Sequence, residues 1–440
     1  MRPIYFILRV FLPYVMRIFY RRTKTINSQK VFRTPTIFVS NHPSAFIDPL
    51  VVANFQWAIF HFMVRSDIFK PWLRPVTWAC HMVPIYRMAE DGKESLEKNS
   101  ESFREAIKVL QSRRSLILFG EGYTDNTFIR CLKPIKKGPA RIAFSAMVTT
   151  NWQQDIMVQP TGLNYTHPKY FRSDVVIQMA PLIHLKDYKE LYDESPAKAM
   201  TQLTRDIEKS MQEQITYIEN KALAPFHENI MIITRKGMNQ FHSDLSIPLE
   251  KRCIYSQELA RRINAEYSDE KEDWTNLKSE LEHYFKLEKK EKINDNWVYQ
   301  FSRTKGKQLF QRFAYLLLVL PIFLIGAMHS IVPFLLVKFF VEKIFKRDVF
   351  WSGVKMLLGT VVIAAFNLPA IWLFYDYIYE SYWLGFLYYL IVPVFTGVIA
   401  YDYFAKLKDT IKILKAPKSV LEKFAHQRTN LVEKIKNLGL

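Results

Sequence analysis

The sequence is poor in glycine and cysteine for its length. Its 440 residues include 13 glycines and three cysteines. No Gly-x-x-x-x-Gly-Lys loop or dinucleotide fingerprint occurs, and so few glycines argue against a backbone cradle for a nucleotide. Cys80, Cys131 and Cys253 stand alone, and the histidines lack spaced partners, so the sequence predicts no disulfide framework, no metal site and no cofactor.

Negative charge is also scarce. The chain has 42 acidic and 61 basic residues, a formal net charge of +19. This balance favours a polyanionic partner, either nucleic acid or a membrane surface with anionic lipid. Aromatic residues make up 15% of the chain and gather in long apolar runs near its C-terminus. Stacking platforms for bases would instead alternate with basic residues, so we expect a membrane partner and no nucleic acid.

Three apolar runs without charge lie near the C-terminus, at Phe313 to Val337, Met356 to Tyr375 and Ser381 to Tyr401. Each reaches the length of roughly 20 residues that a helix needs to cross a bilayer. Three such helices in a soluble core would need a very large apolar partner. The sequence therefore predicts an integral membrane protein.

The charges around these runs predict a topology, because cytoplasmic flanks favour Lys and Arg. Basic residues precede the first run, separate it from the second and follow the third, whereas the second connection carries Asp376 and Glu380. Three full crossings would place basic flanks on opposite sides. A first run that bends back at Pro321, Gly326 or Pro333, followed by a two-span hairpin, keeps all basic flanks on the cytoplasmic side.

The N-terminal half has the pattern of an α/β domain. Residues 3–20 are apolar but are interrupted by Arg9, Pro13 and Arg17, which indicates an interfacial helix or a buried core helix rather than a signal peptide. From Thr36 onward, β-type runs alternate with amphipathic stretches. We expect strands at 36–39, 115–119, 156–163 and 174–179, helices at 49–60, 93–112 and 139–147, and further polar helices between 187 and 308.

A histidine and a carboxylate follow the strand expected at 36–39. The stretch Ser40 to Pro49 contains His42 and Asp48, just where loops of α/β folds carry chemistry. Histidine exchanges a proton near neutral pH, and a nearby carboxylate holds one tautomer and stabilises the imidazolium. The pair could activate a hydroxyl group. The alternative is a strand-end turn in which His42 is incidental.

Four further motifs follow in order: Val83-Pro84-Ile85-Tyr86-Arg87, Phe119-Gly120-Glu121-Gly122-Tyr123-Thr124, Leu132 to Ala143, and Val158 to Leu163. Together with Asn41-His42 and Asp48-Pro49, they resemble the glycerolipid acyltransferase family, which includes lysophosphatidic acid and glycerol-3-phosphate acyltransferases. The resemblance covers roughly residues 35 to 185. Two features depart from the family: five residues, not four, separate His42 from Asp48, and Gly120 replaces a proline. Six helical steps would leave the two side chains roughly 120° apart, so we expect a looped backbone.

The resemblance implies roles for seven residues. His42 would be the general base and Asp48 would orient its ring. The implied substrate-binding residues are Arg87, Glu121, Gly122, Lys136 and Lys137, with Arg87 gripping a phosphate and the two glycines beside Glu121 letting the backbone approach a ligand. Simpler roles remain open, namely a structural salt bridge for Arg87, a turn carboxylate for Glu121 and surface charge for the lysines.

The sequence predicts an α/β acyltransferase domain, a mixed sheet flanked by helices, followed by a helical linker and a C-terminal α-helical membrane region. The expected ranges are an interfacial N-terminal helix (1–30), the catalytic domain (31–190), a helical extension (191–308), the membrane region (309–405) and a basic C-terminal tail (406–440).

The expected activity transfers a fatty acyl group from acyl-CoA or acyl carrier protein to 1-acylglycerol 3-phosphate at the cytoplasmic face. The expected partners are membrane lipid, a phosphate-bearing glycerolipid acceptor and the acyl donor. Glycerol 3-phosphate is the alternative acceptor. A non-catalytic, membrane-anchored basic module that binds anionic lipid or nucleic acid is the alternative of another class.

Overall fold

The computed structural model describes residues 2–28, 34–54, 58–86, 95–267, 271–303 and 307–440. These form two compact units. Unit 1 contains the chain up to Glu219 together with Leu249–Gln257, and unit 2 contains Asn220–Pro248 and Glu258–Leu440. Helix α10 (Leu249–Glu266) therefore contributes its first half to unit 1 and its second half to unit 2.

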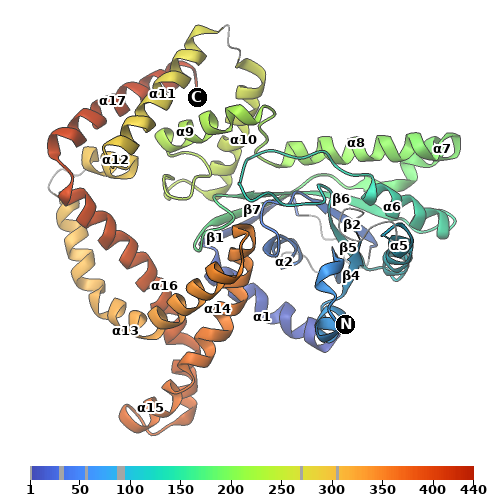
Figure 1. Ribbon diagram of the computed structural model, residues 1–440, viewed down its shortest axis with the longest axis horizontal. Coiled ribbons are helices and arrows are strands. Elements are labelled where there is room, and N and C mark those ends of the chain that lie inside the picture. Colours follow the sequence, from blue (N-terminus) through green and yellow to red (C-terminus); the bar gives the residue numbers. More distant parts are fainter. Residues whose placement is uncertain (1, 29–33, 55–57, 87–94, 268–270, 304–306) are drawn as a thin grey trace. The chain divides into compact units, whose positions relative to one another are not determined.

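Unit 1 is built on a mixed sheet, as the sequence predicts (Figure 1). In the described residues the strand order is β1-β7-β6-β2-β5-β3-β4, with β8 paired to β6. Strands β6, β2, β5, β3 and β4 run parallel, whereas β7 is antiparallel to β6. The strands are β1 (Arg22–Ile26), β2 (Thr36–Ser40), β3 (Phe60–Arg65), β4 (Met82–Ile85), β5 (Ser115–Phe119), β6 (Met157–Tyr165), β7 (Asp174–Met179) and β8 (Ile183–His184).

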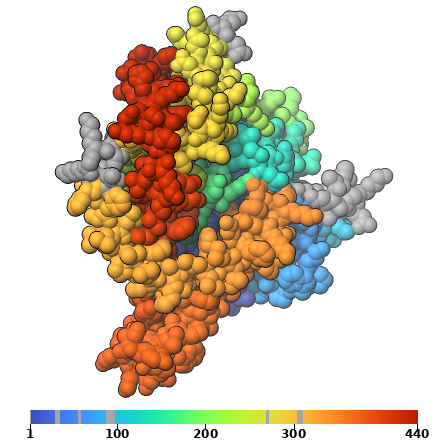
Figure 2. Space-filling model, turned by 60° about the vertical axis from the view of Figure 1, so that its left-hand side comes forward, coloured from blue at the N-terminus to red at the C-terminus, as the bar shows by residue number. Residues whose placement is uncertain are grey.

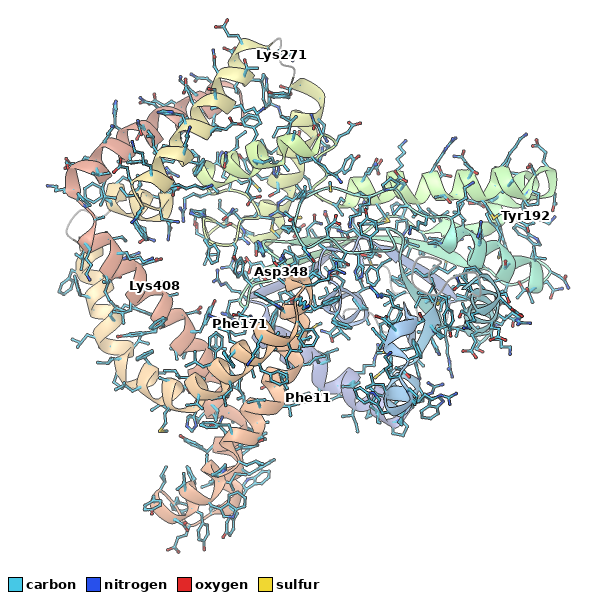
Figure 3. All side chains as sticks on the ribbon, in the orientation of Figure 1. Phe11, Phe171, Tyr192, Lys271, Asp348 and Lys408 are labelled. Carbon is cyan, nitrogen blue, oxygen red and sulfur yellow. The ribbon has the colours of Figure 1, made fainter. Side chains whose placement is uncertain are left out.

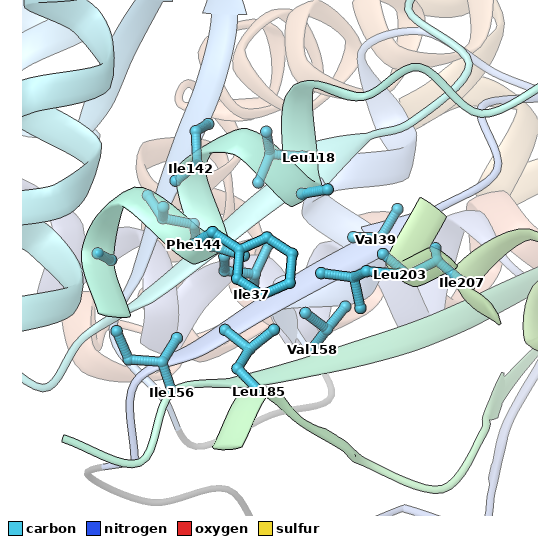
Figure 4. Close-up of a cluster of buried hydrophobic side chains, with 14 of the residues drawn as sticks. Ile37, Val39, Leu118, Ile142, Phe144, Ile156, Val158, Leu185, Leu203 and Ile207 are labelled. Carbon is cyan, nitrogen blue, oxygen red and sulfur yellow. The ribbon is translucent and has the colours of Figure 1, made fainter. Parts of the chain in front are cut away.

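Helices cover the sheet because its central strands are apolar on both faces. All five residues of β2 are buried, and so are all nine of β6. Ile37 and Val39 of β2 meet Phe144 of α6 and Leu203 of α8 in the main core (Figure 4). The helices of unit 1 are α1 (Pro3–Phe19), α2 (Ile47–Asn54), α3 (Arg74–Ala79), α5 (Ser95–Gln111), α6 (Gly138–Thr149), α7 (Lys189–Glu194) and α8 (Pro196–Gln214).

The four strands expected from the sequence correspond to β2, β5, β6 and β7, but β1, β3, β4 and β8 were not expected. The helix expected at 49–60 is wrong in its second half, because α2 ends at Asn54 and β3 begins at Phe60. Strand β3 pairs with β5 on one side and β4 on the other. These partners lie far away in sequence, so local apolar spacing does not reveal them.

The N-terminal helix α1 is amphipathic and ends at Phe19, after which Arg22–Ile26 join the sheet as β1. Its inner face packs on unit 1, where the Phe60 N–H donates a hydrogen bond to the Tyr5 hydroxyl oxygen over 3.0 Å. Its outer face exposes apolar side chains such as Phe6, Val10 and Phe11, the last labelled in Figure 3. Such a face suits an interfacial helix, which stays a prediction.

A buried ion pair joins β7 to α10 within unit 1. The Arg252 guanidinium donates to Asp174 Oδ2, and both side chains are almost completely buried. Close by, the Cys253 thiol lies 3.7 Å from the side-chain oxygen of Gln178 on the same strand. The first half of α10 is thus part of the packing of this sheet, although more than 70 residues of sequence separate it from β7.

Unit 2 is built from helices, and its described residues contain no strand. Helices α11 and α17 lie side by side, coloured yellow and red in Figure 2. Asp295, at the start of α12, is buried and accepts hydrogen bonds from the Tyr284 hydroxyl at 2.9 Å and from Arg428 Nε at 3.0 Å, which ties α11, α12 and α17 together. Outside the candidate membrane spans, unit 2 contains α9 (Ala224–Thr234), α11 (Glu272–Lys290), α12 (Asp295–Arg303) and α17 (Lys418–Asn437).

Three stretches of unit 2 are long and apolar enough to cross a membrane: Phe310–Ile344, Asp348–Tyr377 and Tyr382–Lys415. They contain α13 (Lys307–Ile344), α14 (Trp351–Asn367), α15 (Ala370–Tyr377) and α16 (Tyr382–Lys415). Helix α13 runs through Pro321 and Pro333 without a break, and its ribbon curves in Figure 1. The re-entrant path expected for this run stays a prediction.

The three candidate membrane spans pack closely through a small residue and a polar cluster. A Cβ atom at Gly326 of α13 would collide with the Thr396 carbonyl oxygen of α16, so these backbones are in direct contact. Nearby, His329 Nδ1 lies 2.6 Å from Asn367 Oδ1 of α14, and His329 Nε2 lies 2.9 Å from the Tyr388 hydroxyl of α16. Hydrogen bonds between membrane helices of this kind fix their mutual packing.

Candidate active site

The candidate site forms where three neighbouring parallel strands end. Strand β2 lies between β6 and β5, and Ser40 at its end pairs with Thr161 on one side and Phe119 on the other. His42 follows β2, Glu121 follows β5 and Tyr165 ends β6. Because parallel strands present their carboxyl ends at one edge of a sheet, these three side chains come together there.

His42 and Asp48 form a hydrogen-bonded pair. His42 Nδ1 lies 2.9 Å from Asp48 Oδ2, and the side chains are 18% and 0% exposed. The chain makes the loop expected from the five-residue spacing. Ala45 has a φ of 21°, and the N–H of Ile47, the first residue of α2, donates to the Ser44 carbonyl oxygen over 3.0 Å. The extra residue is therefore absorbed in a turn, and the carboxylate still reaches the imidazole.

Asp48 is held in place by further donors. Its Oδ2 also accepts the Ser44 backbone N–H at 2.7 Å, and its Oδ1 accepts the Tyr165 hydroxyl at 2.8 Å. Burial, and secondly the negative charge of Asp48, raises the pKa of Tyr165 well above its usual value, so this phenol keeps its proton and donates. Because Nδ1 of His42 carries a proton that it donates to Asp48, its Nε2 atom is unprotonated and can accept a proton as a base.

Two contacts position the imidazole ring. It stacks on Phe119, the last residue of β5, with ring centroids 4.0 Å apart. The preceding residue, Asn41, bonds the backbone of Leu163 through both its side-chain atoms, at 2.8 and 3.1 Å. The loop after β2 is thus fixed to both neighbouring strands, and the ring needs little reorganisation to act.

Glu121 connects the histidine loop to a buried lysine. Its Oε1 accepts the His42 backbone N–H at 3.1 Å, and its Oε2 lies 3.5 Å from Lys133 Nζ. Burial raises the pKa of Glu121, and the positive charge of Lys133 opposes this rise. Both oxygens of this carboxylate are therefore engaged within the protein, and its direct role in the structure is to align the loops after β2 and β5.

Sequence reasoning missed Lys133. Its ammonium group also lies 3.1 Å from Asp125 Oδ2, donates to the Tyr123 carbonyl oxygen over 3.0 Å and sits 4.0 Å from the centroid of the Tyr123 ring. The available signal was a single cation in the otherwise uncharged stretch Cys131 to Ile135. A charged residue in such a stretch is buried only when it is paired.

The predicted lysines separate in the structure. Gly122 has a φ of 76°, and a Cβ atom there would lie 2.9 Å from Lys136 Nζ, so Lys136 lies over this glycine beside Glu121. Lys137 instead donates to the Thr201 hydroxyl of α8 over 2.9 Å. The structure thus brings Lys136 to the site and directs Lys137 to a neighbouring helix.

Two other expectations have different outcomes. Arg87 lies outside the described residues. Gly120 was expected to let a ligand approach the backbone, but a Cβ atom there would lie 2.9 Å from both methyl groups of Ile135 and 3.2 Å from Val39. This glycine therefore allows the loop around Ile135 to pack on the sheet, whereas Gly122 lies against the Lys136 side chain.

Three exposed aromatic residues lie in the loops that contribute residues to the site. Phe46 belongs to the loop between His42 and Asp48, Tyr123 follows Gly122, and Tyr170 lies two residues after Pro168, whose carbonyl oxygen accepts the Ser44 hydroxyl over 3.3 Å. All three aromatic side chains are exposed. The site combines an oriented base with nearby cations, an arrangement that can activate a hydroxyl group on an anionic molecule.

Comparisons with known proteins identify the domain. Residues 20–164 match a family model described as Acyltransferase, so this part of the chain is an acyltransferase domain. No curated protein matches the chain. Among solved structures, the crystal structure of the 1-acyl-sn-glycerophosphate (LPA) acyltransferase PlsC from Thermotoga maritima is similar at 16% sequence identity, over 46% of this chain and 77% of that chain, with a TM-score of 0.34.

Proposed function

We propose that this protein is a membrane-bound acyltransferase that moves a fatty acyl group from a thioester donor to the free hydroxyl of 1-acylglycerol 3-phosphate. The observation that carries the proposal is the His42–Asp48 pair, 2.9 Å apart, at the sheet edge of an acyltransferase domain. The sequence motifs between residues 35 and 185 supply the glycerolipid class of acceptor.

The reaction follows from the placement of the base. His42 Nε2 takes the proton from the acceptor hydroxyl as its oxygen attacks the thioester carbonyl carbon, while Asp48 stabilises the imidazolium through Nδ1–H. The tetrahedral intermediate then collapses, the carbon–sulfur bond breaks, and the departing thiolate takes the proton back from His42. The products are an ester and a free thiol. General base catalysis of this kind contributes typically about 10² to 10⁴ in rate.

Two lysines support a phosphate-bearing acceptor. Lys133 Nζ faces Glu121 beside the histidine loop, and Lys136 Nζ lies over Gly122. A phosphate near Gly122 would meet the Lys136 ammonium group, which lies over this glycine. Lys133 is already neutralised by Glu121 and Asp125, so Lys136 supplies the uncompensated charge.

The apolar surroundings support a substrate with an acyl chain. Phe46, Tyr123 and Tyr170, which lie in loops that contribute residues to the site, are exposed, and unit 2 carries three helices that are apolar enough to cross a membrane. Large exposed apolar side chains at a site mark a surface that binds an apolar partner. The acyl chains of both substrates meet this requirement.

Replacement of His42 tests the function. The full-length protein is purified in detergent, and acyl transfer from acyl-CoA and from acyl carrier protein is measured with 1-acylglycerol 3-phosphate or glycerol 3-phosphate as acceptor. We expect transfer to 1-acylglycerol 3-phosphate and a loss of about 10² to 10⁴ in kcat for His42→Ala. The matched control is His184→Ala, because His184 forms an exposed pair with Asp155 at 3.4 Å and should be dispensable.

Each outcome decides a separate part of the proposal. Transfer to glycerol 3-phosphate alone would replace the acceptor, and the donor that supports turnover identifies the thioester. No transfer to either acceptor, or full activity of His42→Ala, would refute the mechanism.

We also propose that the catalytic unit faces the cytoplasm and that the first apolar run is re-entrant. The support is the distribution of basic residues around the three runs. Lys346→Cys, in the connection between the first and second runs, should resist a membrane-impermeant thiol reagent added from outside, whereas Asp376→Cys should react. Both are made after serine replacement of Cys80, Cys131 and Cys253. Efficient labelling at residue 346 would contradict this topology.

A further inference from the structure

A basic pocket lies between α13 and α16, remote in sequence from the acyltransferase domain. Its volume is about 350 Å³, and it is lined by Gln311, Arg312, Tyr315, Leu316, Lys406 and Thr410. Two of these residues are cationic and none carries a carboxylate. Lys408, labelled in Figure 3, lies between the last two along α16 and marks the region of the pocket in the fold.

The two cations are presented in different ways. The Arg312 guanidinium is held by hydrogen bonds to the Thr410 hydroxyl, at 3.4 Å, and to the side-chain oxygen of Gln300. Lys406 Nζ lies 3.8 Å from the centroid of the Tyr315 ring and forms no ion pair with any residue that the structure describes. These contacts are made with neutral groups and a π face, and neither cation forms an ion pair with a carboxylate among the described residues.

Two carboxylates of α16 lie near these cations: Asp402, one turn before Lys406, interacts electrostatically with Lys406, and Asp409 interacts with Arg312. Asp409 accepts hydrogen bonds from Asn296 Nδ2 at 3.3 Å and from Trp297 Nε1 at 3.4 Å. It is therefore directed toward α12 rather than into the pocket. Neither carboxylate is among the lining residues, so the lining itself carries two cations and no anion. Tyr315, which is part of the lining, is a residue type that favours the membrane interface.

The pocket lies at the polar end of two candidate spans. Arg312 immediately precedes the apolar run that starts at Phe313, and Lys406 follows the run that ends at Tyr401. From this level, exposed apolar side chains continue along both helices, among them Leu317 on α13 and Phe404 on α16. A ligand with a phosphate and apolar chains would find a cation pair at the interface and hydrocarbon surface directly beneath it.

We propose that this pocket binds the headgroup phosphate of an anionic phospholipid, with the acyl chains lying along the exposed apolar faces of α13 and α16. Basic pockets between membrane helices recognise anionic headgroups in this way. The site is separate from the acyltransferase centre and does not depend on the proposed reaction. A free phosphate could use the same cations, but it would leave the adjacent apolar surface unused.

Native mass spectrometry of the full-length protein tests the proposal. The protein is equilibrated in micelles with equal amounts of phosphatidylglycerol and phosphatidylcholine, and the retained lipids are counted. We expect the wild type to retain phosphatidylglycerol preferentially and the Arg312→Gln/Lys406→Gln variant to lose about tenfold of this preference, which corresponds to roughly 1.4 kcal/mol. The matched control is Lys338→Gln/Lys343→Gln, which removes the same charge from exposed lysines near the other end of α13.

Two further measurements keep the proposal refutable. Arg312→Lys/Lys406→Arg keeps both charges and should retain the lipid, so a loss of binding only in the glutamine variant reports charge rather than misfolding. Equal lipid retention by the glutamine variant and the wild type would overturn the proposal. Displacement of the lipid by excess inorganic phosphate would overturn it as well, because the occupant would then be a free anion.

Discussion

Asp48→Asn is an informative test of how the carboxylate acts on His42. Asp48 accepts three hydrogen bonds, from His42 Nδ1–H, the Ser44 N–H and the Tyr165 hydroxyl. An asparagine can keep all three contacts if its oxygen faces His42 and Ser44 while its NH2 group donates to the Tyr165 oxygen. The opposite orientation would point the NH2 group at two donors. We therefore expect the first orientation, an intact fold and the same imidazole tautomer.

Only the negative charge is then lost. A hydrogen bond to a charged group exceeds a neutral one by about 1 to 2 kcal/mol, and the imidazolium forms as the acceptor is deprotonated. The kcat of Asp48→Asn should fall roughly 5- to 30-fold, with little change in KM. This loss is far smaller than the roughly 10⁴-fold loss that follows when an amide imposes the wrong tautomer in serine proteases.

Initial rates of the purified full-length protein, with saturating donor and varied acceptor, measure the effect. Asp155→Asn, in the exposed pair with His184, is the matched control and should leave kcat unchanged. Tyr165→Phe removes the partner of the amide NH2 group, so the double variant should lose more than the product of the two single losses. Wild-type kcat in Asp48→Asn would refute a role for the carboxylate. A loss as large as that of His42→Ala would refute the amide orientation.

Two further predictions concern unit 2. Gly326→Ala should lower the thermal midpoint of unfolding in detergent, because its methyl group would meet the Thr396 carbonyl oxygen and overpacking costs typically about 1 to 3 kcal/mol. The control Gly359→Ala should leave the midpoint unchanged, because its methyl group meets nothing within 4 Å. Equal midpoints for the two variants would contradict the close packing of α13 and α16. Burial raises the pKa of Glu288 from 4.5 to about 7, so the native state keeps a proton that the unfolded state loses in this range, and stability should fall by at most about 3 kcal/mol as the pH rises through it. Between pH 5 and pH 8, the thermal midpoint of Glu288→Gln should fall less with rising pH than that of the wild type. If the two proteins have the same pH profile, Glu288 is not the cause of the fall in stability.

The sequence predicted the elements whose pattern is local. Strand β2 is a continuous apolar run and the three membrane runs lack charge, so their residue types alone indicate buried strand and membrane helix. Strand β3 could not be predicted in the same way, because its conformation is fixed by partners in β4 and β5. Pairing between distant segments leaves no periodicity in either one.

In the candidate site, too, the residues in local sequence motifs were predicted and the residues whose partners depend on the strand order were not. His42, Asp48 and Glu121 lie in short motifs at strand ends, and the structure brings them together. Tyr165 was missed because a tyrosine at the end of a buried strand has no distinguishing pattern, and Lys133 was missed although it is the single cation in the stretch Cys131 to Ile135. Their importance lies in which carboxylate each one meets, and this depends on the order of β6, β2 and β5 in the sheet.

The Asp174–Arg252 pair determines how this chain can be divided. Unit 1 is discontinuous, since its strand β7 receives its counter-charge from the first half of α10, beyond the intervening Asn220–Pro248 segment. A gene fragment stopped at Glu219 would encode the whole sheet and still leave the carboxylate of Asp174 buried without its cation, a defect that costs several kcal/mol. A fragment extended through α10 restores the pair but carries Asn220–Pro248 without the rest of unit 2. The acyltransferase domain is therefore best produced as part of the full-length protein.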